Sequence, residues 1–330
     1  MQKILIGIIC STICIFDSFS DNYSERSHDN VSFTFENDLF SGKDSEYTNG
    51  FRVSWVSKKS TPSFISSLMT TLPNFHLETL NRYSFSFGQT MYTPEDLLSK
   101  DYIKDDRPYA GLLFVTFNVL KDSESTLDEY AVKLGVIGPM SLADKTQTFV
   151  HKKVGIPTPQ GWKHQLKNEP ILNLLYRKKY KNFLSYKNNH FESDVIPHSG
   201  FAFGNMDINA SAGAIMRLGK NINSDYGPPI VRPGTSGADF FTYSPEISGY
   251  LFVGVDNKAV VRDIFLDGNT FQKSHSIKKK PLWSELQLGY TISYKKFRFT
   301  HLQAIGTKQF YKQKGKEKFG SITLTYKHDL

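Results

Sequence analysis

Carboxyl, amide and hydroxyl side chains gather at the tip of a predicted hairpin near the start of the chain. Strands are expected over residues 31–40 and 50–58, because apolar and polar residues alternate there with the period of two that a strand with one apolar face requires. Taken alone, these residues are ordinary turn formers, so their chemical role depends on what else lies nearby. The tip contains Glu36, Asn37, Asp38, Tyr47, Thr48 and Asn49.

A second candidate for chemistry is His151, in a later connection. An imidazole, with an unperturbed pKa of ~6.5, can take a proton from water near neutral pH. The alternative is that His151 is a solvated loop histidine. No thiol nucleophile is expected, because Cys10 and Cys14, the two cysteines of the chain, both lie in the predicted export signal.

The N-terminus has the pattern of a signal peptide. Lys3 precedes an apolar run over residues 4–16, and polar residues follow up to Ser20, which predicts a signal over residues 1–20. The apolar run is too short to span a bilayer as a helix. Residues 21–330 contain no Pro, Gly or Ser linker and are expected to form one domain.

Composition favours a membrane barrel. Aromatic residues make up 14% of the chain, although its mean hydropathy is slightly negative. Lipid-facing side chains that alternate with polar lumen-facing ones produce this combination. The formal net charge of +8 points, in an exported protein, to an anionic envelope surface rather than to nucleic acid.

Strand-like segments recur along the whole chain and favour an all-β fold, a twelve-stranded antiparallel transmembrane β-barrel. A soluble β-sandwich is the alternative on strand pattern alone. The segments are expected near residues 31–40, 50–58, 82–92, 109–120, 128–138, 170–182, 192–203, 206–218, 246–256, 283–294, 296–308 and 317–328.

Strand direction predicts where the polar clusters lie. If the first strand starts in the periplasm, the connections at 41–49, 93–108, 139–169, 257–282 and 309–316 are all extracellular. The 139–169 connection has the only helical pattern that we identify. We expect Ser141 and Asp144 to form a capping box there, and Asp144, Gln147 and His151 to share one helix face.

Several motifs, in this order, resemble the lipid A deacylase family that removes 3-O-linked acyl chains. They cover most of the chain from about Val31 onward. The strings are Glu36-Asn37-Asp38-Leu39-Phe40, Tyr47-Thr48-Asn49-Gly50, Tyr92-Thr93-Pro94, Asp106-Arg107-Pro108-Tyr109-Ala110-Gly111, Gly138-Pro139, Gln147 to His151, Gly161-Trp162, Gln165 and Asn168-Glu169-Pro170. The resemblance implies a twelve-stranded outer-membrane barrel that uses calcium.

The resemblance also implies roles for single residues. His151 matches the catalytic histidine, Asn37 and Asp38 an Asn-Asp pair, and Thr48 an essential threonine. A lysine in the loop after the third strand is also needed for catalysis in the family, and it corresponds here to Lys100 or Lys104. Asp38 is the best calcium ligand, with Asn37, Thr48 and Glu36 as helpers, and Arg107, Gln147 and Lys152 are candidates for substrate binding.

The implied reaction is hydrolysis of a lipid A acyl ester in the outer leaflet, at the extracellular rim of a protein that we expect to be a monomer. His151 would activate water, and Ca²⁺ would stabilise the oxyanion. Two other classes remain open: an outer-membrane phospholipase, which would need a serine nucleophile, and a non-enzymatic pore or adhesin. Lysines of the outer loops could contact lipid A phosphates or simply solubilise the loops.

Overall fold

The computed structural model describes residues 29–37, 46–58, 80–123, 125–228, 241 and 247–328. The predicted signal peptide, Asp38, and the connection at 59–79 lie outside the described residues. In the described part of the chain, no helix is both long and apolar enough to cross a membrane.

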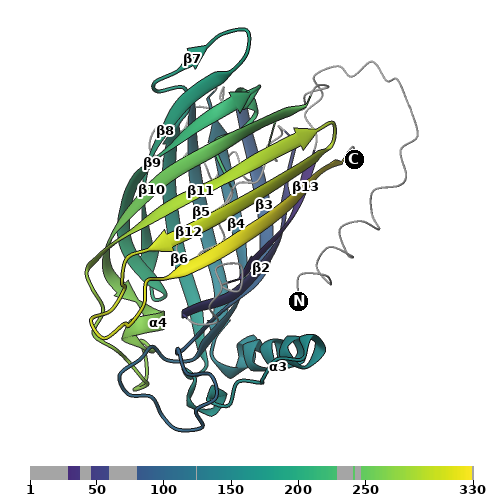
Figure 1. Cartoon of the computed structure of the whole chain (residues 1–330). Coiled ribbons are helices and arrows are strands. Elements are labelled where there is room, and N and C mark those ends of the chain that lie inside the picture. The colour runs from purple at the N-terminus through teal and green to yellow at the C-terminus, as the bar shows by residue number, and fades with distance from the viewer. Residues whose placement is uncertain are drawn as a thin grey trace.

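The described strands form one antiparallel sheet that closes on itself. Its order is β6-β5-β4-β3-β2-β1-β13-β12-β11-β10-β9-β8-β7, and pairing of β6 with β8 completes the barrel (Figure 1). The strands are β1 (Asp29–Asn37), β2 (Glu46–Val56), β3 (Leu80–Thr93), β4 (Ala110–Asp122), β5 (Thr126–Ile137), β6 (Glu169–Tyr180), β7 (Tyr186–Lys187), β8 (Glu192–Gly204), β9 (Asp207–Lys220), β10 (Ser248–Asp263), β11 (Leu282–Tyr294), β12 (Phe297–Gly306) and β13 (Lys318–His328).

The predicted twelve-stranded barrel is therefore confirmed, with β7 as a short hairpin strand beside β8, and the sandwich alternative is wrong. Several strand bounds differ from the prediction by a few residues, and the largest difference is at β10. β10 continues to Asp263 rather than ending at 256, and a second helix, α4 (Ile264–Asp267), follows it. The sequence pattern did not predict α4 because four residues are too few to show helical periodicity.

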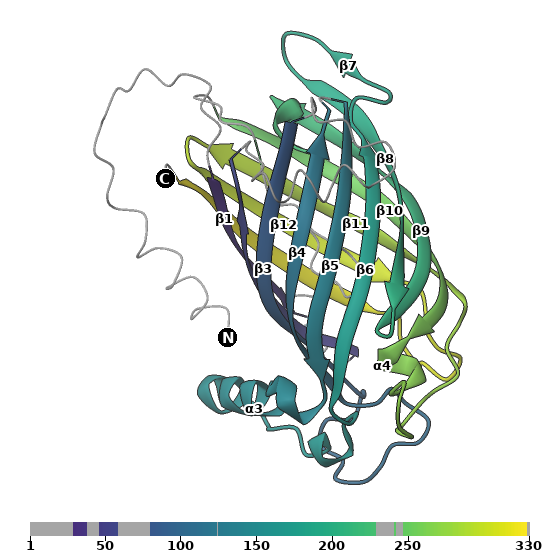
Figure 2. The same ribbon diagram turned by 180° about the vertical axis from the view of Figure 1, so that it is seen from behind.

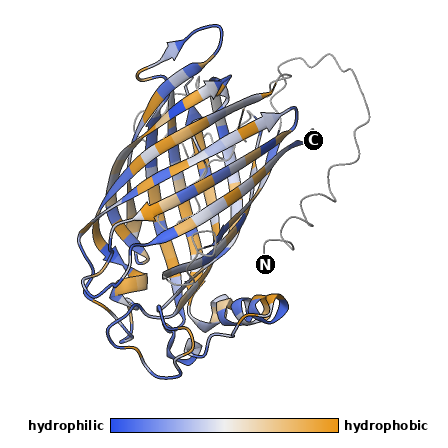
Figure 3. Cartoon of the chain, in the orientation of Figure 1, coloured by the Kyte–Doolittle hydropathy of each residue, from blue (hydrophilic) through white to orange (hydrophobic). Residues whose placement is uncertain are grey.

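Side chains alternate between lipid and lumen along each strand. On β1, Val31 and Phe33 are exposed, whereas Ser32 and Thr34 are buried inside the barrel. Figure 3 shows the resulting bands of apolar and polar residues along the wall. A sheet closed in this way leaves no unpaired strand edge in the membrane.

The long described connections leave one end of the barrel, at 94–109, 138–168, 264–281 and 307–317, which is the end predicted to be extracellular. The 138–168 connection contains η2 (Pro139–Ser141), α3 (Ala143–Val154) and η3 (Trp162–His164). The predicted capping box is wrong, because Ser141 Oγ donates a hydrogen bond to the Gly138 carbonyl, and Leu142, at the N-cap, makes no side-chain cap.

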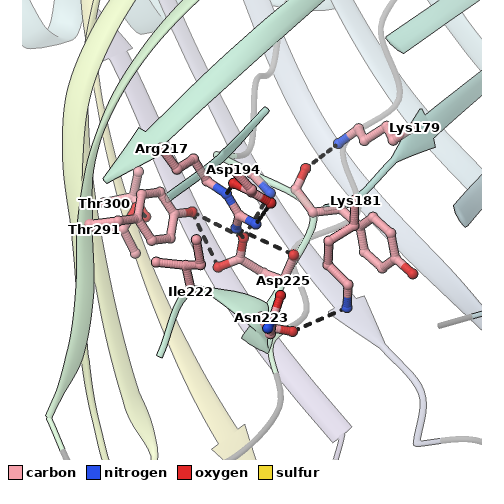
Figure 4. A network of polar contacts seen from close by, with 12 residues as sticks. Lys179, Lys181, Asp194, Arg217, Ile222, Asn223, Asp225, Thr291 and Thr300 are labelled. Atoms are coloured by element: carbon pink, nitrogen blue, oxygen red, sulfur yellow. Dashed lines mark hydrogen bonds and ion pairs between the residues drawn. The ribbon is translucent and has the colours of Figure 1, made fainter. Parts of the chain in front are cut away.

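The other end of the barrel is filled by part of the link between β9 and β10. η4 (Ile222–Ser224) leads into Asp225, whose carboxylate lies 2.8 Å from Arg217 on β9 (Figure 4). The same carboxylate lies 2.7 Å from Arg298 on β12. The next residue, Tyr226, donates its hydroxyl to Asp122 of β4. The segment thus crosses the lumen from β12 to β4.

Candidate active site

Glu36 and Asn37 point to opposite sides of the barrel wall. Glu36 is fully buried and accepts a 2.7 Å hydrogen bond from the hydroxyl of Tyr47. The Tyr47 ring packs against Phe319 inside the barrel. Asn37 instead shares the outward side of β1 with Phe33 and Phe35, which follows from the period of two along a strand. Glu36 is therefore separated from the other residues of the predicted site.

A bulge in β2 brings Thr48 to the outer side. The pairing of β2 with β3 shifts between Tyr47 and Asn49, so Thr48 is the extra residue. Its hydroxyl lies 2.6 Å from the hydroxyl of Thr93, which continues the outward row of Phe85 and Phe87 on β3. Asn49 pairs with Asn37 across β1 and β2. Asn37, Thr48, Asn49 and Thr93 thus place neutral oxygen groups on the outer face of the rim.

The connection that holds α3 packs onto the outside of the same wall. Gln89, on the outward row of β3, donates its amide to the Ser141 carbonyl at 2.6 Å. Gly111 of β4 allows the approach, because a Cβ there would lie 2.2 Å from the Cβ of Ala143. Figures 1 and 2 show α3 outside the barrel at its extracellular end, on the side of β1, β2 and β3.

His151 belongs to the buried stripe of α3. Ala143, Gln147 and His151, each four residues apart, are the buried residues of this helix. His151 Nδ1 lies 2.7 Å from the Pro157 carbonyl oxygen. Because a carbonyl only accepts, Nδ1 carries the proton and Nε2 is left as the basic nitrogen.

Trp162 contacts α3 at Gln147, one helical turn before His151. Its indole Nε1 donates a 2.7 Å hydrogen bond to Gln147 Oε1, and its ring packs in a cluster with Met91, Tyr109 and Ala143. The amide nitrogen of Gln147 is buried with no partner among the described residues. A substrate oxygen beside His151 would meet this donor.

The remaining predicted residues lie elsewhere. Arg107 is completely buried, donates to Gln309 Oε1 at 2.7 Å and lies over the Tyr92 ring, so it braces the loops rather than reaching the outer face of the rim. Lys100 and Lys104 are exposed in the 94–109 connection, where the Lys100 carbonyl is 3.2 Å from His164 Nε2. Lys152 is exposed on α3.

Gln89, Thr93 and Gly111 border the candidate site but were not among the predicted site residues, although Thr93 and Gly111 stand in the motifs that carry the resemblance. Gln89 is recognisable as a polar residue that is buried at a position where the strand alternation predicts exposure to lipid. The sequence shows the alternation but not the burial. The Gln89 amide is tolerated on the outer surface because the connection that holds α3 covers it and accepts its hydrogen bond.

On the outer face of the rim, the described residues offer oxygen atoms of the kind that bind Ca²⁺, but they offer no carboxylate to balance the charge of the ion. No group of three or more His, Cys, Asp or Glu side chains in the described residues is placed to hold a metal ion. The amide and hydroxyl oxygens of Asn37, Thr48 and Asn49 are hard donors of the kind that Ca²⁺ binds. A carboxylate would come from Asp38, which lies outside the described residues.

Comparison with known proteins agrees with this fold. The family model described as outer membrane protein LpxR matches residues 5–328. A solved structure, LpxR from Salmonella typhimurium, matches with a TM-score of 0.75 and 17% identity over 90% of this chain and 99% of that chain. The β domain of the Bordetella autotransporter BrkA reaches a TM-score of 0.45 at 6% identity, covering 92% of this chain and 100% of that one. Comparison with curated proteins gives no match. The chain therefore belongs to the LpxR family of outer-membrane proteins, as the motifs predicted.

Proposed function

We propose that this chain is a lipid A deacylase that hydrolyses the ester of the 3-O-linked acyloxyacyl chain in the outer leaflet of the outer membrane. Membership of the LpxR family supports the class of reaction. The observation that carries the proposal is the position of His151, on the buried stripe of a helix packed against the outer face of the barrel. A lipid substrate would reach this face from the membrane without entering the lumen.

His151 would act as the general base. Because Nδ1–H donates a hydrogen bond to the Pro157 carbonyl oxygen, Nε2 can accept a proton from a water molecule that attacks the acyl carbonyl. The Gln147 amide would orient the substrate or the water. Asn37 and Thr48 would position the ester from the side of the barrel wall.

Calcium is proposed as the cofactor. When bound by Asp38, with Asn37 and Thr48 as neutral donors, the ion would stabilise negative charge on the ester oxygen. Glu36 leaves the proposed ligand set because its carboxylate faces the lumen and accepts the Tyr47 hydroxyl. Lys100 or Lys104, and Lys152, would meet the phosphates of lipid A.

The test is mass spectrometry of lipid A from cells that express the chain or His151→Ala. The wild-type chain should release one acyloxyacyl unit, and His151→Ala should not. Activity of purified protein should stop with a calcium chelator and return with added Ca²⁺. Thr148→Ala, changed on the polar side of the same helix, is the matched control and should keep most activity. Unchanged lipid A with the wild-type chain would overturn the proposal.

Neither alternative class has the same support. A phospholipase of the serine type needs a serine hydroxyl at the basic nitrogen of the histidine, and among the described residues the hydrogen bond of His151 is made by Nδ1 to the Pro157 carbonyl, with no serine hydroxyl bonded to Nε2. A passive pore needs an open lumen, whereas the segment with Asp225 and Tyr226 crosses the lumen here. A serine-directed covalent inhibitor that abolished activity would favour the phospholipase.

A further inference from the structure

We propose that the exposed apolar side of α3 is inserted among the acyl chains of anionic lipids in the outer leaflet. The helix that carries His151 would then be a membrane-bound surface rather than a solvated loop. The inference concerns where α3 lies and does not rest on the proposed hydrolysis.

The apolar side chains of α3 and its N-cap are too exposed to belong to a core. Leu142, Phe149, Val150 and Val154 have exposed fractions of 46%, 63%, 43% and 56%. Leu142 and Phe149 lie seven residues apart and share one side of the helix, and Val150 and Val154 lie one turn apart. The barrel covers the stripe with Ala143, Gln147 and His151, and Val154, eleven residues after Ala143, lies on the same stripe but is exposed at the end of the helix. Apolar surface left in water in this arrangement marks an interaction site.

The surface to which α3 is joined faces lipid. Gln89 and Gly111, on which the connection rests, continue the outward rows of β3 and β4. The next residues on those rows include Phe87, Phe85 and Val115, which are exposed on the barrel wall. Figure 2 shows α3 beside the ends of these strands and outside the wall. Its apolar residues therefore extend the lipid-facing band of the barrel.

Charges on α3 fit the head groups of anionic lipids. Lys145, Lys152 and Lys153 are exposed on the helix, and Lys153 Nζ lies 5.7 Å from the centre of the Phe149 ring. A lysine can bury its alkyl stem beside an apolar residue and extend its ammonium group to a phosphate. This combination is typical of helices that lie in the plane of a membrane interface.

The test measures the depth of single nitroxide labels in the full-length protein. Cys10→Ser and Cys14→Ser would remove the two cysteines of the chain, so each new cysteine carries the only label. Labels at Phe149→Cys and Val150→Cys report on the proposed membrane side. Thr148→Cys, on the polar side of α3, is the matched control, Val115→Cys on the barrel wall is the lipid reference, and Lys314→Cys in an outer loop is the water reference.

The protein would be reconstituted in phosphatidylcholine vesicles with and without phosphatidylglycerol. At residues 149 and 150, collisions with oxygen relative to a water-soluble nickel complex should approach the ratio at Val115→Cys, and should rise when phosphatidylglycerol is present. At Thr148→Cys the ratio should approach that at Lys314→Cys.

Two results would overturn the proposal. Labels at 149 and 150 that match the water reference in both vesicles would show a solvated helix. Labels shielded from both oxygen and nickel would show contact with another protein surface. Because label depth is measured without hydrolysis, these results test the position of α3 independently of the deacylase activity.

Discussion

The Nδ1 atom of His151 lies 2.7 Å from the carbonyl oxygen of Pro157, six residues further along the chain. The contact depends on how α3 ends. Gly155 adopts the left-handed conformation with φ 75°, and the Ile156 amide donates back to the His151 carbonyl at 3.0 Å. The backbone thus turns around the imidazole and sets both its orientation and the nitrogen that carries the proton.

Gly155 should consequently support activity through its backbone conformation, since its amide also donates to the His151 carbonyl at the end of α3. A Cβ at this position would meet no atom within 4 Å, so a substitution acts only through the backbone. We expect Gly155→Val to strain the turn by roughly 1–2 kcal/mol and to lower the deacylation rate by about tenfold. Gly155→Asn, which tolerates the left-handed region, should retain most of the rate. Equal rates for the two variants would contradict this role.

The opposite orientations of Glu36 and Asn37 give a second prediction. Glu36→Gln keeps an acceptor for the Tyr47 hydroxyl, so the rate of lipid A deacylation and its calcium dependence should not change. Asn37→Leu keeps the branched shape of the side chain but removes the amide from the outer rim, and should lower the rate and raise the calcium concentration needed for half-maximal activity. A weaker response to calcium in Glu36→Gln would place that carboxylate back in the metal site.

Much of the barrel could be predicted because its signal is local. Alternation such as that of Val31, Ser32, Phe33 and Thr34 follows directly from one side facing lipid and the other the lumen. The same alternation predicts that the side chains of Glu36 and Asn37 point to opposite sides of the barrel wall. It does not show that the site lies on the outer surface, because that depends on α3 folding over Gln89, a contact between residues that are distant in sequence.

Prediction failed where tertiary contacts override the structure that a local sequence pattern favours. Ser141 and Asp144 have capping-box spacing, yet the Gly138 carbonyl takes the serine hydroxyl. The burial of Arg107 over the Tyr92 ring was likewise not predictable from its motif, and its role in substrate binding stays a prediction. The link that fills the lumen depends on ion pairs across the barrel, which no pattern in one strand reveals.

The loop that contains His275 should loosen in mild acid. Burial lowers the pKa of His275 from its ordinary value of 6.5, while Asp106 and a hydrogen bond with the Lys104 backbone oppose the shift and His164 reinforces it. The unfolded loop therefore takes up a proton first, so the loop is most stable above pH 6.5 and loses stability as pH falls below it.

Hydrogen exchange of residues 268–281 and 100–104, compared between about pH 7.5 and about pH 5.5, would measure this loosening once the intrinsic effect of pH is removed. His275→Asn should abolish most of the difference. A pH response that persists unchanged in His275→Asn would assign it to another group.

The ion pairs of Asp225 should fix the segment that follows η4 in the lumen and so keep the lumen closed. Its carboxylate is buried between Arg217 and Arg298, and loss of one partner from a buried ion pair costs about 3–5 kcal/mol because the remaining charge is uncompensated. Asp225→Asn should lower the temperature at which the barrel unfolds and should produce ion conductance across planar bilayers, where the wild-type protein conducts little. Asp105→Asn is the matched control, since Asp105 forms an exposed ion pair with Lys312 and exposed pairs contribute little. An Asp225→Asn barrel as stable and as closed as the control would show that the apolar contacts of Ile222 and Tyr226 are sufficient to hold this segment in the lumen.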